Sequence, residues 1–563
     1  MIPKTCFGTK QGRLLALLAG FALLAAACST ELQQLSAEEA QDELDEIVND
    51  IDFEEGIVTD KATLELGAEV DLIDTLPPID EYPIVVDGRG QVELEIFAST
   101  EKSGDDTDGW LNEIAEEFNN SNPTLANGSS VSVDVRKIAS GTGYQYIAAG
   151  RDLPDAFSPS NHLWIQMAAE KTEMTPISEQ LVPNVAGIVM KTETADRLGG
   201  ADSLTPSDVI DAVVDDQIVM GYTDPFASST GLNFLLTVLD DFAEGDEARI
   251  TAPDVASVFE QFQRRLPFVA LTTLQIRESV ENDNGTLDAF VMEWQTFVNT
   301  DSLESGFEFI PFGIRHDNPL YAVGNVGADK IEGLELFADF ATSSSNSSKA
   351  QDFGFEPPSY DSSVNIPSGS TLVQAQQVWK EKKDGGRPVA AVFVVDTSGS
   401  MAGSRIQALH RAMLSATDFV TPGNSVGVVE FNDRAVKRLE IEPFNINHQG
   451  KFVALANDLV PGGGTAMYDG VVLGLKMLTD EVKSSPDTRP LLIVLTDGEV
   501  TAGKSLGDVD DAIAGLRIPV HTVGFEADLD ELGQLSALVE AASINASEAN
   551  VEFKMAALFN AGL

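Results

Sequence analysis

Two short apolar runs, each closely followed by an aspartate, constrain the fold of this chain most. Residues 390–395 end directly at Asp396, and residues 491–495 end one residue before Asp497. Continuous apolar runs of this length are typical of parallel strands that are covered on both faces. Ligands bind beyond the carboxyl ends of the strands in open α/β sheets. The sequence therefore predicts an α/β sheet with both aspartates at its ligand-binding end.

Hydroxyl side chains accompany the two aspartates. They lie in the run V-V-D-T-S-G-S-M and directly after the glycine triplet 462–464. Hard divalent cations prefer oxygen ligands, and an incompletely enclosed site leaves positions for water or a partner's oxygen. An isolated aspartate with two serines is as often a helix cap, but the later threonine and aspartate favour a surface metal site completed by another molecule. The predicted metal ligands are Asp396, Ser398, Ser400, Thr465 and Asp497.

With these residues in place, the chain from about Pro388 to its end resembles a von Willebrand factor type A domain, with predicted bounds 388–563. The five ligands match the metal-ion-dependent adhesion site of that family one by one. The resemblance implies a Rossmann-like, doubly wound domain in which the two serines bind the metal directly. The threonine and the second aspartate bind directly or through water, and an acidic side chain of a protein or cell-wall partner completes the site. Mg²⁺ is the expected ion, with Mn²⁺ or Ca²⁺ as alternatives.

The N-terminus carries the pattern of an export signal. Lys4, Lys10 and Arg13 precede an apolar stretch, 14–27, that ends in small residues before Cys28. A basic segment followed by a short apolar one is typical of a signal peptide and is short for a membrane span. The end of this segment resembles a bacterial lipobox, which implies a signal peptide over 1–27 and lipidation, including palmitate, of Cys28. An ordinary signal peptide or an uncleaved anchor are the alternatives.

The rest of the composition fits an extracytoplasmic chain anchored to a bacterial membrane. The only other cysteine, Cys6, lies in the predicted signal, so the mature chain has no internal disulfide. The formal charge is −55, from 35 basic and 90 acidic residues, which excludes nucleic-acid binding through phosphates. Anionic lipid headgroups would repel such a chain, so a covalent anchor is expected. We interpret the acidity mainly as solubility at the cell surface.

Residues 28–88 are predicted to form an acidic tether. They carry a short helix over 36–51, because Ser36 and Glu39 fit a capping box. Prolines at 77, 78 and 83 favour an extended segment after it. Charge repulsion within the tether is expected to hold the folded part away from the membrane.

Residues 89–359 form a second block in which predicted strands and helices alternate, as in a parallel sheet. The block resembles an extracellular solute-binding protein with two lobes, on the motifs S-T-E-K, S-G-T-G and G-Y-T-D-P-F-A-S-S-T-G. Segments 184–190 and 307–314 are predicted to cross between the lobes. A linker with a helix over 371–383 follows in 360–387, and we expect this helix to couple the lobes to the metal site.

The resemblance implies a ligand between the lobes, held by hydroxyls and backbone amides at helix N-termini. Such groups suit a small anion or carboxylate, although each cluster alone is equally well explained as a helix cap. Trp294, next to the last cleft residue, is expected to be a core residue. The predicted cleft residues are Ser99, Thr100, Ser140, Thr142, Ser228, Ser229, Thr230 and Glu293.

The sequence favours a binding protein over an enzyme. The histidines lack the spacing of a zinc site, and neither a G-x-S-x-G motif nor a thiol in the mature chain offers a nucleophile. The leading prediction is a cell-surface lipoprotein with metal-dependent adhesion, in which the two-lobed block is a sensor or a scaffold. The alternative is the receptor of a transporter that delivers a small anionic or polar solute.

Overall fold

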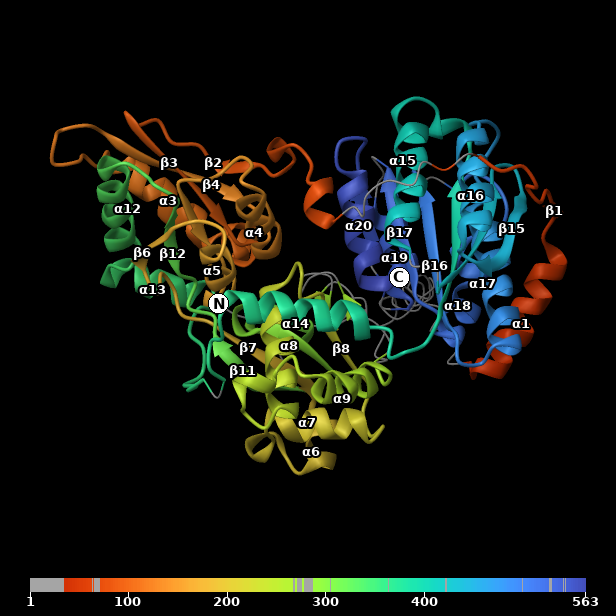
Figure 1. The fold of residues 1–563 in the computed structure, drawn as a ribbon, viewed down its shortest axis with the longest axis horizontal. Coiled ribbons are helices and arrows are strands. Elements are labelled where there is room, and N and C mark those ends of the chain that lie inside the picture. Colours follow the sequence, from red (N-terminus) through yellow and green to blue (C-terminus); the bar gives the residue numbers. More distant parts are fainter. Residues whose placement is uncertain are drawn as a thin grey trace, which may run out of the picture.

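The computed structural model describes residues 35–62, 64, 71–266, 269–270, 276–277, 287–303, 305–362, 364–420, 423–498, 500–525, 529–539, 541 and 543–563. The predicted signal peptide and Cys28 lie outside the described residues. The chain forms one seven-stranded sheet and two smaller sheets, each flanked by helices (Figure 1). No helix in the described ranges is long and apolar enough to cross a membrane.

The seven-stranded sheet forms the C-terminal domain, in the order β1-β15-β14-β13-β16-β17-β18. Strands β14, β13, β16, β17 and β18 run parallel, and β15 pairs antiparallel to β14. The bounds are β13 Val389–Asp396, β14 Ser425–Phe431, β15 Ala435–Pro443, β16 Arg489–Thr496, β17 Val520–Phe525 and β18 Ser543–Ala546. Both apolar runs predicted as strands are therefore central, parallel strands of this sheet.

Helices cover both faces of this sheet, as its apolar strands require. Along β13, Phe393 and Val395 face the core under α15, α16 and α20, whereas Val392 and Val394 face the core under α17, α18 and α19. This alternation is the doubly wound arrangement predicted for the domain. The helix bounds are α15 Ser404–Phe419, α16 Ile446–Asp458, α17 Met467–Ser484, α18 Asp510–Leu516, α19 Leu529–Ala537 and α20 Val551–Gly562.

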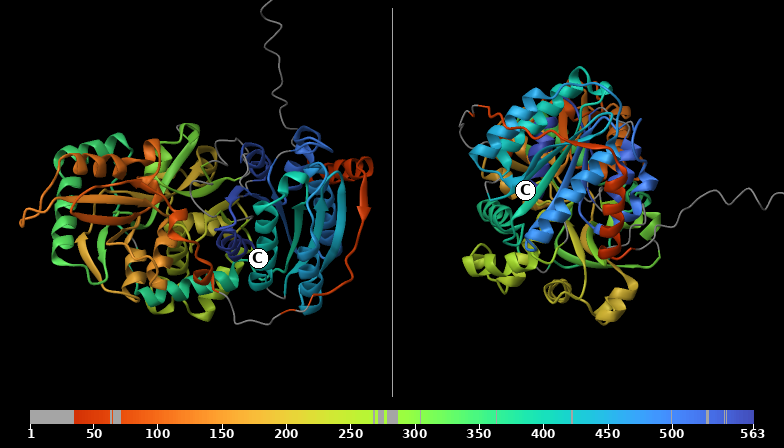
Figure 2. Two further views of the ribbon diagram at one scale, coloured as in Figure 1. Left: turned by 90° about the horizontal axis from the view of Figure 1, so that it is seen from above. Right: turned by 90° about the vertical axis from the view of Figure 1, so that its right-hand side faces the viewer.

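The acidic N-terminal segment is part of this domain. Helix α1 (Ala37–Asp50) begins at the predicted capping box, in which the Ser36 hydroxyl accepts from the Glu39 amide at 3.3 Å. Its Leu44 and Val48 are buried in the core that contains α17 and α18. Strand β1 (Phe53–Glu55) then pairs parallel to β15 at the sheet edge. Figures 1 and 2 show α1 and β1, in red, against the outer side of the domain.

The prediction of a tether over 28–88 is therefore wrong for the part that the structure describes. Ala40, Leu44 and Val48 recur every four residues and form a buried stripe on α1, while the acidic residues lie on its outer side. Gly515 permits the close approach of α1, because a side-chain carbon there would lie 2.6 Å from the Ala40 methyl. The domain thus combines 36–58 with 388–563, and the two-lobed block is an insertion between β1 and β13.

The inserted block has two lobes, as predicted. The first contains a six-stranded sheet in the order β2-β4-β3-β5-β12-β6, and the second a five-stranded sheet in the order β11-β7-β10-β8-β9. The first-lobe strands are β2 Ile84–Val86, β3 Val92–Ala98, β4 Val131–Lys137, β5 Ala156–Ser158, β6 Met174–Ser178 and β12 Leu320–Val323. The second-lobe strands are β7 Val185–Lys191, β8 Met220–Thr223, β9 Val269–Ala270, β10 Ala289–Glu293 and β11 Phe307–Arg315.

Each lobe carries its own helices. In the first lobe these are α2 Thr100–Ser103, α3 Trp110–Asn120, α4 Ser140–Ala149, α5 His162–Ala169, α12 Ala328–Ala341 and α13 Ser344–Asp352. In the second lobe they are α6 Thr192–Leu198, α7 Pro206–Val214, α8 Ser229–Phe242, α9 Pro253–Gln263 and α11 Trp294–Val298. The predicted crossing segments are mostly β7 and β11 themselves, antiparallel neighbours in the second lobe. The chain therefore crosses just before β7 and just after β11.

Helix α14 (Gly369–Lys382) confirms the helix predicted in the linker and contacts both lobes. At its start, a side-chain carbon on Gly369 would lie 2.2 Å from the Gln166 carbonyl oxygen of α5, so only glycine fits there. Towards its end, the Trp379 indole donates to the Tyr222 hydroxyl of β8 at 2.5 Å. The linker is thus part of the inserted block.

The C-terminal domain also packs on the inserted block. Phe553 and Ala556 of α20 share a core with Leu72 of a short 3₁₀ turn, η1 (Leu72–Thr75), that precedes the first lobe. Beside them, the Asn550 amide donates to the Glu81 carboxylate at 2.6 Å. Apolar and polar contacts therefore join the two parts of the molecule.

Replacing Leu44 with alanine should destabilise the protein by about 2–5 kcal/mol, because Leu44 is fully buried between α1 and the sheet domain. The measurement is urea unfolding of the mature chain. Glu46→Ala on the exposed side of the same helix is the control, with an expected change below about 0.5 kcal/mol. A tether would give no difference between the two variants.

Candidate metal site and inter-lobe network

Three loops meet at the carboxyl end of β13 and β16. The loop after β13 carries Ser398 and Ser400, the loop before α17 carries Thr465, and Asp497 directly follows β16. Two backbone hydrogen bonds join the first two loops, from Gly399 N to Gly463 O at 3.0 Å and from Gly462 N to Thr397 O at 2.8 Å. Gly463 has φ +88°, and a side chain there would collide with the Asp433 carboxylate. Gly463 therefore permits this close approach of the two loops.

Asp396 lies at the bottom of the site and is fully buried. Its Oδ1 accepts from the Ser398 amide at 2.7 Å, and its Oδ2 accepts from the Thr496 hydroxyl at 2.5 Å. Burial raises the pKa of Asp396 to about 6, and the nearby Asp497 charge adds to this, while the hydrogen bonds oppose it. The carboxylate is thus held in a fixed orientation at a position where burial alone disfavours its charge.

Asp497 supplies the second carboxylate. Its Oδ2 accepts from Arg405 Nη1 at 3.0 Å, whereas its buried Oδ1 has no hydrogen-bond partner among the described residues. A buried acceptor without a partner is costly, and a cation bound between the loops would satisfy it. The two serine hydroxyls lie 2.9 Å apart, so further oxygens are close by.

The predicted ligands thus fit a divalent cation. Asp396, Ser398, Thr465 and Asp497 are buried, and Ser400 is exposed at the mouth of the site. Among the described residues, no three His, Cys, Asp or Glu side chains group as a metal site. Two aspartates with three hydroxyls are instead the oxygen-rich set that Mg²⁺ accepts, with room for water or a partner's oxygen.

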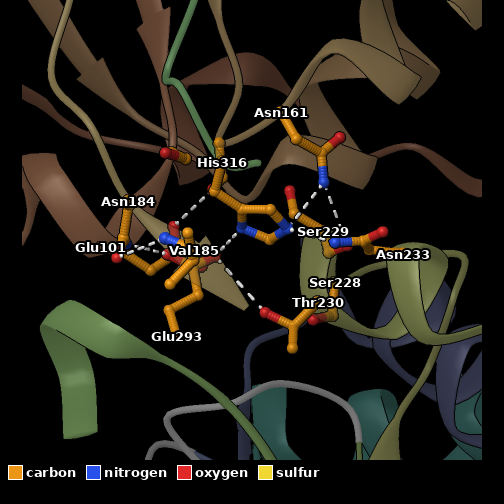
Figure 3. Close-up of polar contacts among 12 residues, drawn as sticks. Glu101, Asn161, Asn184, Val185, Ser228, Ser229, Thr230, Asn233, Glu293 and His316 are labelled. Carbon is orange, nitrogen blue, oxygen red and sulfur yellow. Dashed lines mark hydrogen bonds and ion pairs between the residues drawn. The ribbon is translucent and has the colours of Figure 1, made fainter. Parts of the chain in front are cut away.

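A second polar cluster lies between the two lobes (Figure 3). At its centre, the buried Glu293 carboxylate pairs with His316 Nδ1 at 2.8 Å and accepts from the Asn184 amide at 2.8 Å. The other ring nitrogen of His316 lies 3.0 Å from the Asn161 amide and 3.2 Å from that of Asn233. Asn184 and His316 lie where the chain crosses between the lobes, so this network joins the two crossing segments.

The structure brings most of the predicted cleft hydroxyls to this network, where they bond to the protein itself. Ser99 Oγ accepts from Lys102 Nζ at 2.5 Å. Ser140 Oγ accepts from the Ser160 amide at 3.2 Å. Ser229 Oγ accepts from the Trp164 indole at 2.9 Å. Ser228 caps α8, Thr230 donates to Glu293 at 3.4 Å, and Thr142 instead interacts with Tyr82.

Glu101 and Lys102 add two more charges at the lobe junction. Burial and the charge of Glu293 raise the pKa of Glu101 to about 7, and burial lowers the pKa of Lys102 to about 7. Both residues lie in the motif S-T-E-K, which indicates them only as the start of a helix. No local sequence pattern marks His316 or Asn161, which come to this network from distant parts of the chain. An anion at this point would meet two carboxylates, which disfavours the predicted anionic ligand.

A cavity of about 330 Å³ opens between the lobes beside this network. Arg277 of the second lobe reaches Asp108 of the first at 3.3 Å, and the Gln295 amide donates to the same carboxylate at 3.1 Å. Trp294 packs on Phe297 and Phe309, which agrees with its expected role in packing. The cavity is lined by Thr100, Gly104, Asp105, Asp106, Thr107, Asp108, Lys137, Arg277 and Asn299.

Comparisons with known proteins address the C-terminal domain most directly. Residues 391–499 match the family model of the von Willebrand factor type A domain. Over 158 residues the chain is 34% identical to inter-alpha-trypsin inhibitor heavy chain H3 of Mesocricetus auratus, which covers 25% of this chain and 17% of that protein. The chain thus spans about a sixth of the length of this relative.

Two solved structures are also similar. The periplasmic binding protein AfuA of Actinobacillus pleuropneumoniae is 13% identical with a TM-score of 0.39, over 52% of this chain and 98% of that chain. A von Willebrand factor type A protein of Catenulispora acidiphila is 20% identical with a TM-score of 0.28, over 31% of this chain and 42% of that chain. The family match and the doubly wound sheet together show that the C-terminal domain is a von Willebrand factor type A domain.

Replacing Glu293 with alanine should cost about 3–5 kcal/mol of stability, because it leaves buried His316 and Asn184 without their shared partner. Glu293→Gln keeps one acceptor oxygen and should cost less. Urea unfolding followed by tryptophan fluorescence measures the loss. Exposed Glu335→Ala is the control, and equal stability of the two alanine variants would contradict the role of this network.

Proposed function

We propose that this protein binds a carboxylate-bearing partner through a divalent cation, Mg²⁺, held by its C-terminal domain. The observation that carries the proposal is the buried Asp497 Oδ1, which lacks a hydrogen-bond partner among the described residues and lies in a loop cluster rich in hydroxyls. A cation supplies that partner and, when bound, offers an electrophilic position to an oxygen of another molecule.

Each predicted ligand has a defined part in this proposal. Ser398 and Ser400 would hold the ion directly, and Thr496 orients the Asp396 carboxylate beside them. Thr465 and Asp497 would bind the ion directly or through water. Thr465 is fixed by its backbone, whose amide donates to the Thr501 hydroxyl at 2.9 Å. Because Ser400 is exposed, a protein or cell-wall partner can reach the ion with its own carboxylate.

The proposed location is the outer side of a bacterial cell membrane, with a lipid on Cys28 as the anchor. The basic and apolar segments before Cys28 support this location. In this setting the protein is a binding protein and not an enzyme, and the two-lobed block is a scaffold or sensor for the metal-binding domain. The contacts of α14 with both lobes and of α20 with Leu72 and Glu81 support that role.

Mg²⁺ or Mn²⁺ should raise the melting temperature of the mature chain, and Asp396→Ala should remove this response. A ligand that binds only the folded state stabilises it by mass action, by about 2.7 kcal/mol at 100 times its dissociation constant. Differential scanning fluorimetry with EDTA and with metal measures the effect. Asp458→Ala, at the exposed end of α16, is the control. It also removes one carboxylate, and it should keep the response to metal if that response depends on the site and not on the overall negative charge.

The proposal fails if the wild-type melting temperature does not respond to metal, or if Asp396→Ala responds as strongly as wild type. Partner binding gives a second readout. Cell-envelope proteins retained by immobilised wild-type protein in Mg²⁺ should be released by EDTA and should not be retained by Asp396→Ala.

A second candidate function is the receptor of a transporter for a small polar solute. The cavity of about 330 Å³ between the lobes favours it, because its lining is polar and carries both cationic and anionic side chains. Lys137 pairs there with Asp105 at 3.4 Å, and Arg277 pairs with Asp108 at 3.3 Å. Charges of both signs suit a solute that carries both a cationic and an anionic group.

Under this alternative, a solute screen should find a compound that raises the melting temperature of the mature chain without metal. Zwitterionic amino acids and polar sugars are the first solutes to test, because the cavity lining is polar and carries both charges. Lys137→Ala should reduce the shift, whereas exposed Lys380→Ala, on α14, should not. A flat screen would favour adhesion or scaffolding.

A further inference from the structure

Arg405 is a positively charged residue at the mouth of the candidate metal site. It lies in the first turn of α15, directly after the loop that carries Ser398 and Ser400. Its Nη1 lies 3.0 Å from Asp497 Oδ2 and 3.2 Å from the Ser400 carbonyl oxygen. The Arg405 side chain is 32% exposed, while that of Asp497 is 2% exposed. A guanidinium therefore contacts two of the five proposed ligand residues.

Without Arg405, the two carboxylates of the site would have no positively charged partner among the contacts described for them. Asp396 and Asp497 are both buried, and the Asp497 carboxylate lies close enough for its charge to disfavour the charged form of Asp396. The contacts described for Asp396 are a backbone amide and a hydroxyl, both neutral, whereas Asp497 is paired with Arg405. Arg405 thus supplies a positive charge that balances one of the two carboxylates, and a buried carboxylate without such a partner is costly.

The geometry leaves the two oxygens of Asp497 with different roles. Arg405 donates to Oδ2, and Oδ1 remains without a hydrogen-bond partner in the described part of the chain. A divalent ion that binds Oδ1 would share one carboxylate with the guanidinium. Two cations on one buried carboxylate repel each other, and this repulsion is weakly screened where the carboxylate is buried.

We propose that Arg405 is a resident counter-cation of the metal site, which stabilises the site before metal binds and lowers its affinity for the divalent ion. The inference rests on the proposed function, because it requires that the five residues bind metal. A role in which Arg405 only orients Asp497 makes the opposite prediction, since loss of an orienting residue weakens metal binding, typically by about 10–100-fold.

Two substitutions separate charge from geometry. Arg405→Gln removes the charge and keeps an amide donor for Asp497, and Arg405→Lys keeps the charge. The control is Arg411→Gln on the same helix, because Arg411 pairs with Glu548 on the surface and its loss changes the net charge of the chain equally. The probe is Mn²⁺ alone, with free ion quantified by electron paramagnetic resonance in titrations of the mature chain.

Arg405→Gln should bind Mn²⁺ about ten-fold more tightly than wild type, as expected when a unit charge is removed near the ion. Arg405→Lys should stay within about three-fold of wild type, as should Arg411→Gln. In EDTA, Arg405→Gln should melt below wild type, and saturating Mg²⁺ should raise its melting temperature more than that of wild type. A merely structural role would lower both melting temperatures equally.

Equal or weaker Mn²⁺ binding by Arg405→Gln overturns the proposal. Tighter binding by Arg411→Gln to the same extent also overturns it, because the effect would then follow from net charge alone. Wild-type protein that binds no Mn²⁺ contradicts the proposed function itself, and the role of Arg405 with it. Loss of Mn²⁺ binding in the double variant Asp396→Ala, Arg405→Gln confirms that the gain arises at this site.

Discussion

The pairing of β1 with β15 and the burial of α1 determine how the whole chain is arranged. After β1 the backbone stays on the domain, with Val58 N bonded to Arg438 O at 2.9 Å and Ala62 N bonded to Gly450 O at 2.9 Å. The chain returns to the same sheet at β13. Both ends of the two-lobed block are therefore fixed on one domain, so the block is an insertion that has less freedom than one joined by a single linker.

Between the lobes and the candidate metal site the chain passes through only α14 and β13. Helix α14 starts against α5 of the first lobe and ends against the second lobe, where Trp379 bonds to Tyr222. A few residues later the chain enters β13, and this strand ends at Asp396. At the turn, Arg489 of β16 pairs with Asp384 at 3.3 Å. A change in the angle between the lobes would thus strain α14 or its contacts, at a short distance along the chain from Asp396.

The sequence indicates the loops of the candidate metal site better than the arrangement around them. Apolar strands and oxygen donors form a local pattern, so short motifs are enough to select the five candidate ligands. The capping box of α1 was also found, but the many acidic residues hid the stripe of Ala40, Leu44 and Val48, and the three residues of β1 carry no strand pattern. Partners such as His316 and Asn161 depend on contacts across the lobes, which local patterns do not reveal.

The cleft between the lobes also shows that local sequence patterns do not reveal the partners of polar side chains. The sequence places its hydroxyls near helix starts, and the structure agrees, yet Ser99, Ser140 and Ser229 are already bonded to other protein groups. A helix start predicts a donor or acceptor and does not predict which partner takes it. The candidate metal site differs from the cleft, because the buried Asp497 Oδ1 has no hydrogen-bond partner among the described residues. This buried oxygen lies on the carboxylate that Arg405 contacts, and it still lacks a partner. The site in the C-terminal domain is therefore the better supported of the two candidate binding sites.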